Sequence, residues 1–301
     1  MREFKLDFSG IGAAKGGTTW IAHCLGEHPS VCMSLPKETN FFLRTHISSC
    51  LPVPRYHDGM AHYDEGLEWY KRKFSHRKPG QLYGEFSNAY LADPESAGLL
   101  HAHNPEMKLL GCFRNPVDAA YAGYFQLSRV QPLPDVFEDF LARYPQLLEY
   151  GRYHHNLQPF LKLFPREQIH LTLFDDIRAD PVAFYRGICE FLEIDSFAPR
   201  TLSRRVNPRT VTRSRMVHNL RCAIAGFMAR SAATRQVRKA LGSLGVDRTA
   251  LKLFRRLNEK PGIVPPMAPE TRRRLVEFFR EENEALGELL HRDLSHWNES
   301  P

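Results

Sequence analysis

The residues best suited to chemistry lie in a short turn near the amino terminus. Lys15 precedes two glycines and two threonines, after an apolar segment and before a helical pattern. A strand, a glycine-rich turn and a helix start together favour an anion, because unpaired backbone N–H groups and the positive end of the helix dipole face it. A tight turn alone would explain the glycines but not the lysine and threonines. We therefore expect a phosphate-binding set made up of Lys15, Gly16, Gly17, Thr18, Thr19 and Trp20.

This turn differs from the phosphate loop of nucleoside triphosphatases. Their pattern GxxxxGK(S/T) fits from Gly12 onward, except that Thr18 occupies the lysine position and the lysine has moved to residue 15. A small-molecule kinase that uses ATP and Mg²⁺ is therefore disfavoured, and it is kept as an alternative.

Two further segments carry groups for proton transfer and phosphate binding. Lys37 and Glu38 precede the aromatic pair Phe41 and Phe42, so a carboxylate could take a proton from a nucleophile beside a wall that excludes water. An exposed ion pair is the alternative interpretation of the lysine and glutamate. Arg114 ends an apolar run, where a guanidinium at the end of a strand can bind a phosphate through two hydrogen bonds.

In this order, the segments resemble the PAPS-dependent sulfotransferases, in particular the branch of heparan sulfate sulfotransferases and their bacterial relatives. The resemblance rests on residues 15–19, 36–42, 82–91 and 108–124 and extends, more loosely, over residues 5–215 and 269–290. It implies 3′-phosphoadenosine 5′-phosphosulfate (PAPS) as the donor. It also implies transfer of a sulfuryl group to a hydroxyl, or less readily an amine, of a small-molecule, lipid or carbohydrate-like acceptor.

The resemblance also implies a role for each motif. Glu38 would be the general base, Lys15 with Lys37 would stabilise the leaving phosphate oxygen, and Arg114 would bind the 3′-phosphate. No metal ion is expected, because lysine and the helix dipole already match the leaving group. The alternative bases are His23, His28, His46, His57 and His62. The acceptor contacts expected are Glu85, Phe41, Phe42 and His154, and further cofactor contacts are Arg209, Arg213 and Arg215.

Two positions depart from the family pattern. Phe86 stands where some heparan-modifying members have a lysine, so a highly sulfated glycan is not specifically expected as the acceptor. Ala122 stands where the family has a serine that contacts the 3′-phosphate. Loss of that hydroxyl would weaken binding by about 1–2 kcal/mol unless Ser128 or Arg129 replaces it. A degenerate sulfotransferase fold that only binds a nucleotide or another anion is therefore a further alternative.

Positive charge is concentrated in one part of the chain. The net charge is +7, and residues 200–260 hold 16 lysines and arginines against the two acids Asp247 and Glu259. Binding to nucleic acid or to an anionic membrane is one alternative that this block raises. It would leave Glu38 and Arg114 without a role, so we expect neither a nucleic-acid partner nor stable membrane insertion. Residues 216–260 could instead form an acceptor lid, a homodimer contact or a membrane-facing surface.

Alternating strand and helix patterns must position these groups. Strands are expected at residues 4–8, 81–84, 108–113 and 169–174, and helix starts at Asp93-Pro94, Pro116 and Asp180-Pro181. Helices are expected later at 216–229, 231–242, 247–257 and 269–290. The pattern predicts an α/β, P-loop-like three-layer fold, with a central parallel sheet flanked by helices, a helical carboxyl-terminal part, and ligands beyond the carboxyl ends of the strands.

The composition sets the remaining expectations. With 301 residues, 43% hydrophobic and 25% charged, the chain fits one soluble domain, divided into a cofactor-binding core at 1–200 and a helical basic part at 201–301. No export signal is recognised, so a cytoplasmic enzyme of metabolite, lipid or natural-product chemistry is expected. The six cysteines are scattered without metal-ligand spacing, and reduced thiols are expected.

Overall fold

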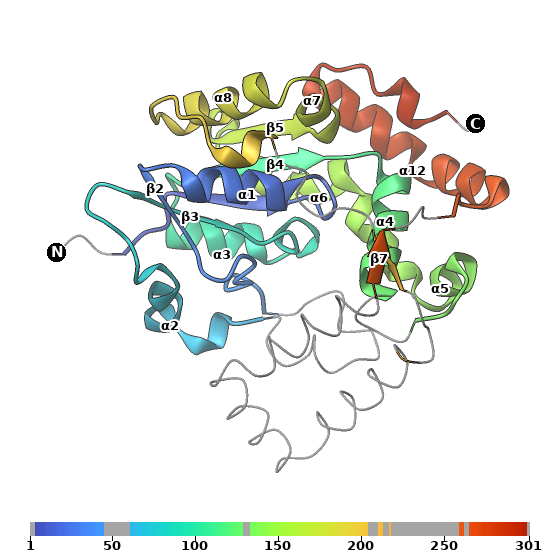
Figure 1. Ribbon diagram of the computed structural model, residues 1–301, viewed down its shortest axis with the longest axis horizontal. Coiled ribbons are helices and arrows are strands. Elements are labelled where there is room, and N and C mark those ends of the chain that lie inside the picture. The colour runs from blue at the N-terminus through green and yellow to red at the C-terminus, as the bar shows by residue number, and fades with distance from the viewer. Residues whose placement is uncertain are drawn as a thin grey trace, which may run out of the picture.

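The centre of the protein is a parallel sheet of five strands. The computed structural model describes residues 4–44, 61–128, 133–203, 210–212, 217, 259–261 and 265–299. Within these ranges the strand order is β2-β3-β1-β4-β5, and every neighbouring pair is parallel (Figure 1). The strands are β1 (Phe8–Gly12), β2 (Val31–Met33), β3 (Leu82–Phe86), β4 (Lys108–Phe113) and β5 (Ile169–Leu173).

Helices and short 3₁₀ turns connect the strands. A separate antiparallel pair joins β6 (Thr210–Thr212) to β7 (Glu259–Pro261). The helices are α1 (Thr18–Glu27), α2 (Leu67–Lys71), α3 (Ser96–His103), α4 (Pro116–Ser128), α5 (Phe137–Arg143), α6 (Tyr153–Leu163), α7 (Phe174–Ala179), α8 (Pro181–Leu192) and α12 (Pro269–Leu290). The 3₁₀ turns are η2 (Tyr63–Glu65), η3 (Arg72–Phe74), η4 (Tyr90–Ala92), η5 (Pro145–Gly151), η6 (Arg166–Gln168), η7 (Arg200–Ser203) and η8 (Ser295–Trp297).

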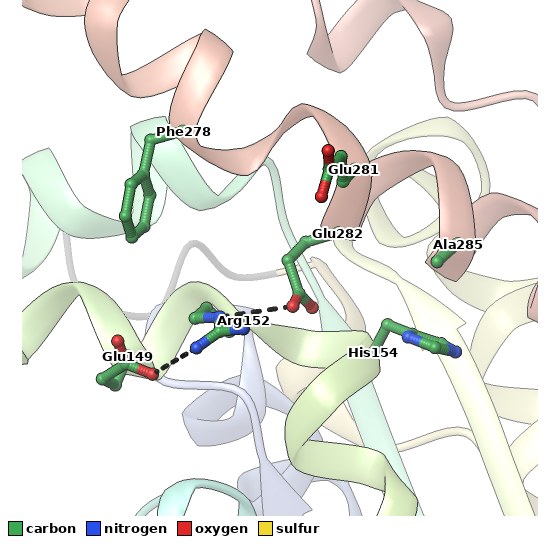
Figure 2. Close-up of a pocket in the computed structure, with 7 residues that line it drawn as sticks. All are labelled: Glu149, Arg152, His154, Phe278, Glu281, Glu282 and Ala285. Atoms are coloured by element: carbon green, nitrogen blue, oxygen red, sulfur yellow. Dashed lines mark hydrogen bonds and ion pairs between the residues drawn. The ribbon is translucent and has the colours of Figure 1, made fainter.

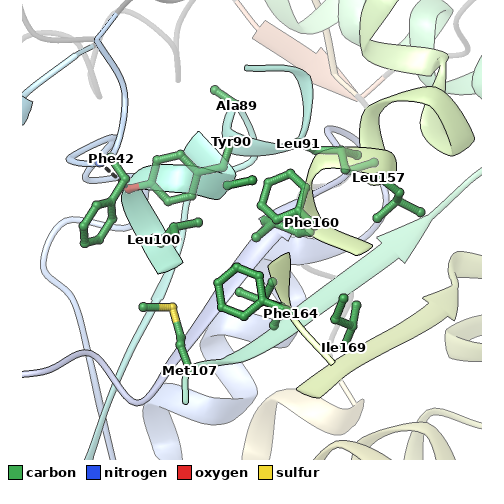
Figure 3. Close-up of a cluster of buried hydrophobic side chains, with 14 of the residues drawn as sticks. Phe42, Ala89, Tyr90, Leu91, Leu100, Met107, Leu157, Phe160, Phe164 and Ile169 are labelled. Atoms are coloured by element: carbon green, nitrogen blue, oxygen red, sulfur yellow. Dashed lines mark hydrogen bonds between the residues drawn. The ribbon is translucent and has the colours of Figure 1, made fainter. Parts of the chain in front are cut away.

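Apolar side chains cover both faces of the sheet, as expected for parallel strands. Along β4, Leu110 and Cys112 join a cluster with α1 and α8, whereas Leu109 and Phe113 join a cluster with α3 and α6. Figure 3 shows part of the second cluster, where side chains of η4 and α3 meet those of α6. A third cluster joins α4, α5 and α12. The helices therefore form layers on either side of the sheet, which confirms the predicted three-layer α/β fold (Figure 1).

The predicted strands agree with the structure except at their ends. The strand at 108–113 is confirmed at both ends, and those at 81–84 and 169–174 shift by one or two residues. The first strand was placed too early, because it runs over the glycine-containing residues 8–12 and not over 4–8. The short β2 was not predicted, since three residues carry too little periodicity.

Two of the three predicted helix starts agree with the structure, whereas the start expected at Asp93-Pro94 is two residues early, because α3 begins at Ser96. Pro116 opens α4, and Asp180 caps α8 by accepting hydrogen bonds from the backbone amides of Val182 and Ala183 at 3.0 and 2.9 Å. Helix α12 at 269–290 is confirmed and packs against α4 and α6. The helices expected at 216–229, 231–242 and 247–257 lie outside the described residues, apart from residue 217. The assignment of the whole chain to one domain therefore stays a prediction.

The strand order places a topological switch point between β1 and β4. The chain passes from β1 across β3 to β2, returns to β3, and then continues to β4 on the other side of β1. Loops that follow β1 and β4 thus leave in opposite directions, and ligands of open α/β sheets bind at such points. Among the described residues, no helix is both long enough and apolar enough to cross a lipid bilayer.

Candidate active site

The glycine turn after β1 is pressed against the neighbouring strand. A Cβ atom built at Gly16 would lie 2.0 Å from the carbonyl oxygen of Cys112 in β4, so only glycine fits there. Gly17 has a φ of 90° and is the N-cap residue of α1, a conformation that also favours glycine. No side chain caps this end of α1, and its first turn holds no acid. The positive end of the helix is therefore presented to an anion.

Lys15 lies in the same turn and reaches helix α4. Its Nζ atom donates a hydrogen bond of 2.7 Å to Oε1 of Gln126, 111 residues away in sequence. The side chain is half-buried, and its backbone has a φ of 67°. The ammonium group is thus held between the turn after β1 and the helix after β4, which is the crevice that the strand order predicts.

Lys37 and Glu38 lie beyond the end of β3, the strand next to β1. The backbone N–H of Glu38 donates to the carbonyl oxygen of Phe86 at 2.9 Å. Its carboxylate Oε1 accepts hydrogen bonds from Lys37 Nζ at 2.7 Å and from Asn88 Nδ2 at 2.8 Å. The Glu38 side chain remains 46% exposed, so the second carboxylate oxygen and the surrounding surface are accessible to a reactant.

Asn88 is a site residue that sequence reasoning missed. The segment Leu82–Leu91 was recognised, but only Glu85 in it was given a role. An amide that donates to Glu38 Oε1 helps to fix the orientation of the carboxylate. The signal that could have found it is its place two residues after the end of β3, where parallel strands present side chains at the carboxyl edge.

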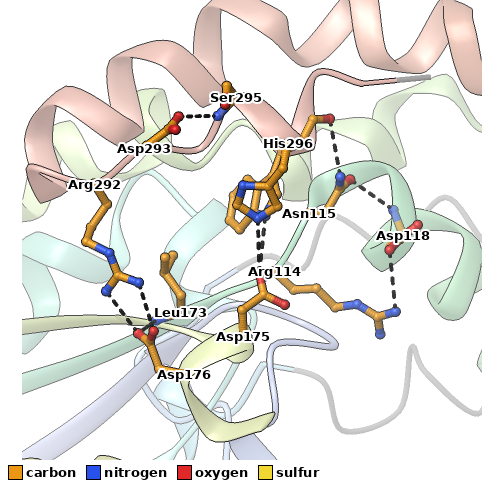
Figure 4. Close-up of polar contacts among 11 residues, drawn as sticks. Arg114, Asn115, Asp118, Leu173, Asp175, Asp176, Arg292, Asp293, Ser295 and His296 are labelled. Atoms are coloured by element: carbon orange, nitrogen blue, oxygen red, sulfur yellow. Dashed lines mark hydrogen bonds and ion pairs between the residues drawn. The ribbon is translucent and has the colours of Figure 1, made fainter. Parts of the chain in front are cut away.

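Arg114 follows β4 directly and lies among groups from three elements (Figure 4). Its side chain is 18% exposed, with Nη2 3.9 Å from Asp118 Oδ2 and the guanidinium carbon 5.2 Å from the centre of the Phe174 ring. Asp118 also forms an ion pair of 2.9 Å with Arg272 of α12. Two guanidinium groups thus share the carboxylate of Asp118, and a guanidinium can bind a phosphate through two hydrogen bonds.

The carboxyl-terminal residues hold the Arg114 segment in place. Asn115 donates from Nδ2 to the carbonyl oxygen of Trp297 at 3.2 Å, and its Oδ1 accepts from the backbone amide of Val117 at 3.0 Å. The same oxygen accepts from the backbone amide of Asp118 at 3.4 Å (Figure 4). Arg292 pairs with Asp176 in α7 at 2.9 Å. These contacts tie the end of the chain to the loops after β4 and β5, so Arg114 is fixed by its neighbours in sequence and in space.

This set of donors fits a nucleotide that carries a phosphate group at each end. The first donors are Lys15 and the uncapped end of α1, beyond β1, and the second is Arg114, beyond the adjacent strand β4. A sequence model of the sulfotransferase domain matches residues 8–207 of the chain. The chain belongs to the sulfotransferase family. PAPS is the sulfuryl donor of this family.

Individual relatives agree with this assignment. The chain is 28% identical over 197 residues to heparan sulfate glucosamine 3-O-sulfotransferase 5 of Mus musculus, a match of 61% of this chain and 52% of the relative. It is 27% identical over 191 residues to the human 3-O-sulfotransferase 6, covering 60% and 50% of the two chains. The chain thus spans about half the length of these curated relatives.

A solved structure supports the fold over the whole chain. The crystal structure of a sulfotransferase from Alicyclobacillus acidocaldarius superimposes with a TM-score of 0.71 and 24% sequence identity. The match covers 99% of this chain and 100% of that one. The resemblance inferred from the motifs is therefore confirmed at the level of family and fold.

Several residues predicted to touch ligands are buried in this sulfotransferase. Trp20 is packed in the core, and its Nε1 donates to the carbonyl oxygen of Thr201 at 3.1 Å. Phe41 and Phe42 lie in the core at 3% and 1% exposure, and Glu85 is 0% exposed. The expectation that the side chains of Phe41, Phe42 and Glu85 contact an acceptor is not met in this structure, because the core already surrounds them. Thr18 is buried and Thr19 is half-buried at the start of α1.

In this structure the hydroxyl of Ser128 does not take the place of the serine hydroxyl that is missing at position 122. Ala122 is half-buried on α4, one turn before Gln126. The hydroxyl of Ser128 donates to the carbonyl oxygen of Phe125 at 3.1 Å within the same helix. Arg129, Arg209, Arg213 and Arg215 lie outside the described residues, so their predicted phosphate contacts stay predictions.

His154 lies in a separate pocket between η5, α6 and α12 (Figure 2). The pocket has a volume of about 410 Å³, and none of the other predicted site residues lines it. The Nε2 atoms of Gln158 and His154 are 3.0 Å apart, and Arg152 pairs with Glu149 and Glu282 at 3.2 and 3.3 Å. The structure therefore does not bring His154 together with Glu38 in one cavity.

Proposed function

We propose that this protein transfers a sulfuryl group from PAPS to an acceptor hydroxyl, with Glu38 as the general base. The observation that supports this most directly is the placement of Lys15, Glu38 and Arg114 beyond the carboxyl ends of the adjacent strands β1, β3 and β4. PAPS, when bound, supplies the activated sulfuryl group. The residues of the chain supply binding, charge and proton transfer.

Each polar group of the crevice has a role in this proposal. Lys15 and the uncapped amino end of α1 would hold the phosphosulfate end and stabilise negative charge on the leaving oxygen. Arg114 would bind the 3′-phosphate. Glu38 would accept the proton of the acceptor, and Lys37 and Asn88 would keep its carboxylate oriented. Orientation and charge, as in phosphoryl transfer, would supply most of the rate enhancement.

The acceptor proposed first is a hydroxyl of a carbohydrate-like molecule, with small molecules and lipids as the alternatives. The curated relatives are named for 3-O-sulfation of glucosamine in heparan sulfate, which is the reason to test amino-sugar hydroxyls first. Phe86 in place of the lysine of some heparan-modifying members argues against a requirement for a highly sulfated chain. The cytoplasm is the proposed compartment, in agreement with the buried free thiols of Cys24, Cys32, Cys112 and Cys189.

Calorimetric titration with 3′,5′-adenosine bisphosphate tests the cofactor site. Wild type should bind it at micromolar concentration, and Lys15→Ala and Arg114→Ala should each weaken binding by about 10–100-fold, the loss expected for a charge-assisted hydrogen bond. ATP with Mg²⁺ is titrated in parallel. Stronger binding of ATP than of the bisphosphate would favour the kinase alternative, and binding of neither would leave only a degenerate fold.

Turnover tests the chemistry. Release of bisphosphate from PAPS is followed with glucosamine oligosaccharides, with 4-nitrophenol, and with water as the acceptor. Glu38→Gln should lower the rate by about 100-fold or more, within the range of general base catalysis, while bisphosphate affinity stays at the wild-type value. A wild-type rate in Glu38→Gln would remove Glu38 from the proposal and direct attention to the histidines named above as alternative bases.

A further inference from the structure

Glu85 is a fully buried carboxyl group that the proposed chemistry does not use. It lies in β3 with 0% exposure, and burial raises the pKa of its carboxyl above the ordinary value. No lysine, arginine or histidine among the described residues forms an ion pair with it. A buried carboxyl group without a basic partner requires hydrogen-bond donors, because its desolvation is otherwise too costly.

Three hydroxyl groups donate to this carboxyl, and the hydroxyl of the fully buried Tyr70 lies beside it. Tyr90 donates to Oε1 at 2.6 Å, Ser87 donates to Oε2 at 3.4 Å, and the hydroxyl of Thr39 makes a short hydrogen bond to Oε2. The three donors come from the loop after β3 and from the loop that carries Glu38. A hydroxyl has one proton to donate and two lone pairs to accept with. Each of these hydroxyls, having given its proton to Glu85, is therefore left as an acceptor.

The acceptors are used by three consecutive backbone amides. The N–H of Asn40 donates to Ser87 Oγ at 3.0 Å, that of Phe41 to Thr39 Oγ1 at 3.4 Å, and that of Phe42 to Tyr90 OH at 3.1 Å. Figure 3 shows the Phe42 and Tyr90 pair beside the apolar cluster. Each amide is thus connected to one carboxyl group through one hydroxyl, and all three connections run in the same direction, from amide to hydroxyl to carboxyl.

The loop held in this way needs such support. Glu38 and Asn40 have φ values of 63° and 49°, in the left-handed region that costs a residue other than glycine about 1–3 kcal/mol. Such a conformation persists only where the surroundings determine it. The N–H of Glu38 bonds to Phe86 at 2.9 Å, and the next anchors along the chain are the three amides that Glu85 reaches through hydroxyls.

We infer that Glu85 is the positioning residue for the loop that carries the general base. It fixes the direction of the hydroxyls of Thr39, Ser87 and Tyr90, which fix the amides of residues 40–42, and these hold Glu38 over the crevice. This inference rests on the proposed role of Glu38. Glu85 itself touches no reactant, which agrees with its complete burial.

Residue-resolved hydrogen exchange of the full chain tests the one-to-one connection of hydroxyls and amides. Ser87→Ala should speed exchange at the amide of Asn40, Thr39→Val at Phe41, and Tyr90→Phe at Phe42, each by about tenfold, as expected for loss of one net hydrogen bond. Glu85→Gln should speed exchange at Phe42 if its NH₂ group faces Tyr90, or at Asn40 and Phe41 if it faces Ser87 and Thr39, because an NH₂ group cannot accept from a hydroxyl. Tyr185→Phe, which removes a buried hydroxyl on the opposite face of the sheet, is the matched control and should leave these amides unchanged.

The rate of PAPS conversion separates positioning from general stability. Glu85→Gln should lower the rate at saturating PAPS by about tenfold or more, since displacement of a catalytic group by about 1 Å costs up to about 100-fold, and bisphosphate affinity should stay at the wild-type value. A merely structural role would weaken binding and rate together. Unchanged exchange at residues 40–42 in Glu85→Gln, or equal acceleration throughout the sheet in the hydroxyl variants, would overturn the inference.

Failure of the proposed function would give a different result. If Glu38→Gln keeps the wild-type rate while the exchange pattern follows the hydroxyl variants, the network is real but Glu38 is not the base. If Glu38→Gln abolishes turnover while the exchange pattern is absent, Glu38 keeps its role and Glu85 does not position it.

Discussion

Substitution of Gly16 by alanine would perturb the phosphate turn without removing a polar group. The added Cβ would lie 2.0 Å from the carbonyl oxygen of Cys112 and 3.0 Å from its carbonyl carbon, whereas ordinary contacts begin at 3.4 Å. Because the obstacle is backbone in the middle of the sheet, the turn must move away by about 1.4 Å. A displacement of about 1 Å in a catalytic arrangement costs about 100-fold in rate, or about 2.7 kcal/mol of activation free energy.

The effect of this substitution should fall on function more than on folding. Overpacking lowers the free energy of unfolding by about 1–3 kcal/mol, which urea denaturation measures. Calorimetry with 3′,5′-adenosine bisphosphate and the rate of PAPS conversion measure the site. Gly98→Ala in α3 is the matched control, because a Cβ there meets nothing within 4 Å. It should keep wild-type binding and gain about 0.5–1 kcal/mol of stability from replacing a helical glycine.

Wild-type bisphosphate affinity in Gly16→Ala, in a protein that denatures at the wild-type urea concentration, would refute this reasoning. It would mean either that the turn moves at no cost or that phosphate binds elsewhere. Loss of binding in Gly98→Ala would equally show that affinity in this protein responds to distant substitutions.

Three further predictions concern the helix after β4, the buried carboxyl and the cap of α8. Ala122→Ser should tighten bisphosphate binding by about 1 kcal/mol, or about fivefold, in calorimetry; unchanged affinity would mean that position 122 does not face the 3′-phosphate. Burial raises the pKa of Glu85 above its ordinary value of 4.5. Between the pKa of the unfolded chain and the higher pKa of the folded protein, the folded protein binds more protons than the unfolded chain. The free energy of unfolding should therefore fall as pH rises through this window, relative to Glu85→Gln. Parallel urea curves for the two proteins at every pH would contradict that linkage. Asp180→Ala should lower the free energy of unfolding by about 1 kcal/mol without a change in bisphosphate affinity, and a loss of affinity would show that α8 contributes to the site.

The contacts of the residues after α12 affect how variants near Arg114 should be interpreted. Trp297 accepts from Asn115 through its carbonyl oxygen and donates through Nε1 to Asp175 at 3.3 Å. Removal of the residues after α12 would therefore release the loops after β4 and β5 together. Truncation effects on binding should consequently be compared with Arg114→Ala before they are assigned to a role of the tail itself.

The sequence by itself determined the family and the fold class, and it suggested the binding groups that are proposed for the site. Lys15 and Arg114 belong to local units in which a strand ends, the chain turns and a helix begins, and such units are encoded within about ten residues. Parallel strands place all their carboxyl ends at one edge, so groups that follow different strands are brought together without further information. For this reason the positions of Lys15 and Arg114 at one edge could be expected before any contact was known, whereas Glu38 follows β2, which the sequence pattern did not reveal.

Only the tertiary structure decided which of the recognised side chains are accessible. Strands of a parallel sheet are buried on both faces, so alternation along β3 could not show that Glu85 points into the core. Its hydroxyl partners, the contact of Asn88 with Glu38 and the contact of Lys15 with Gln126 join segments that lie apart in the chain. Such contacts depend on how the loops pack after the sheet has formed, and a hydroxyl or an amide carries no periodic signal that would reveal its partner in advance.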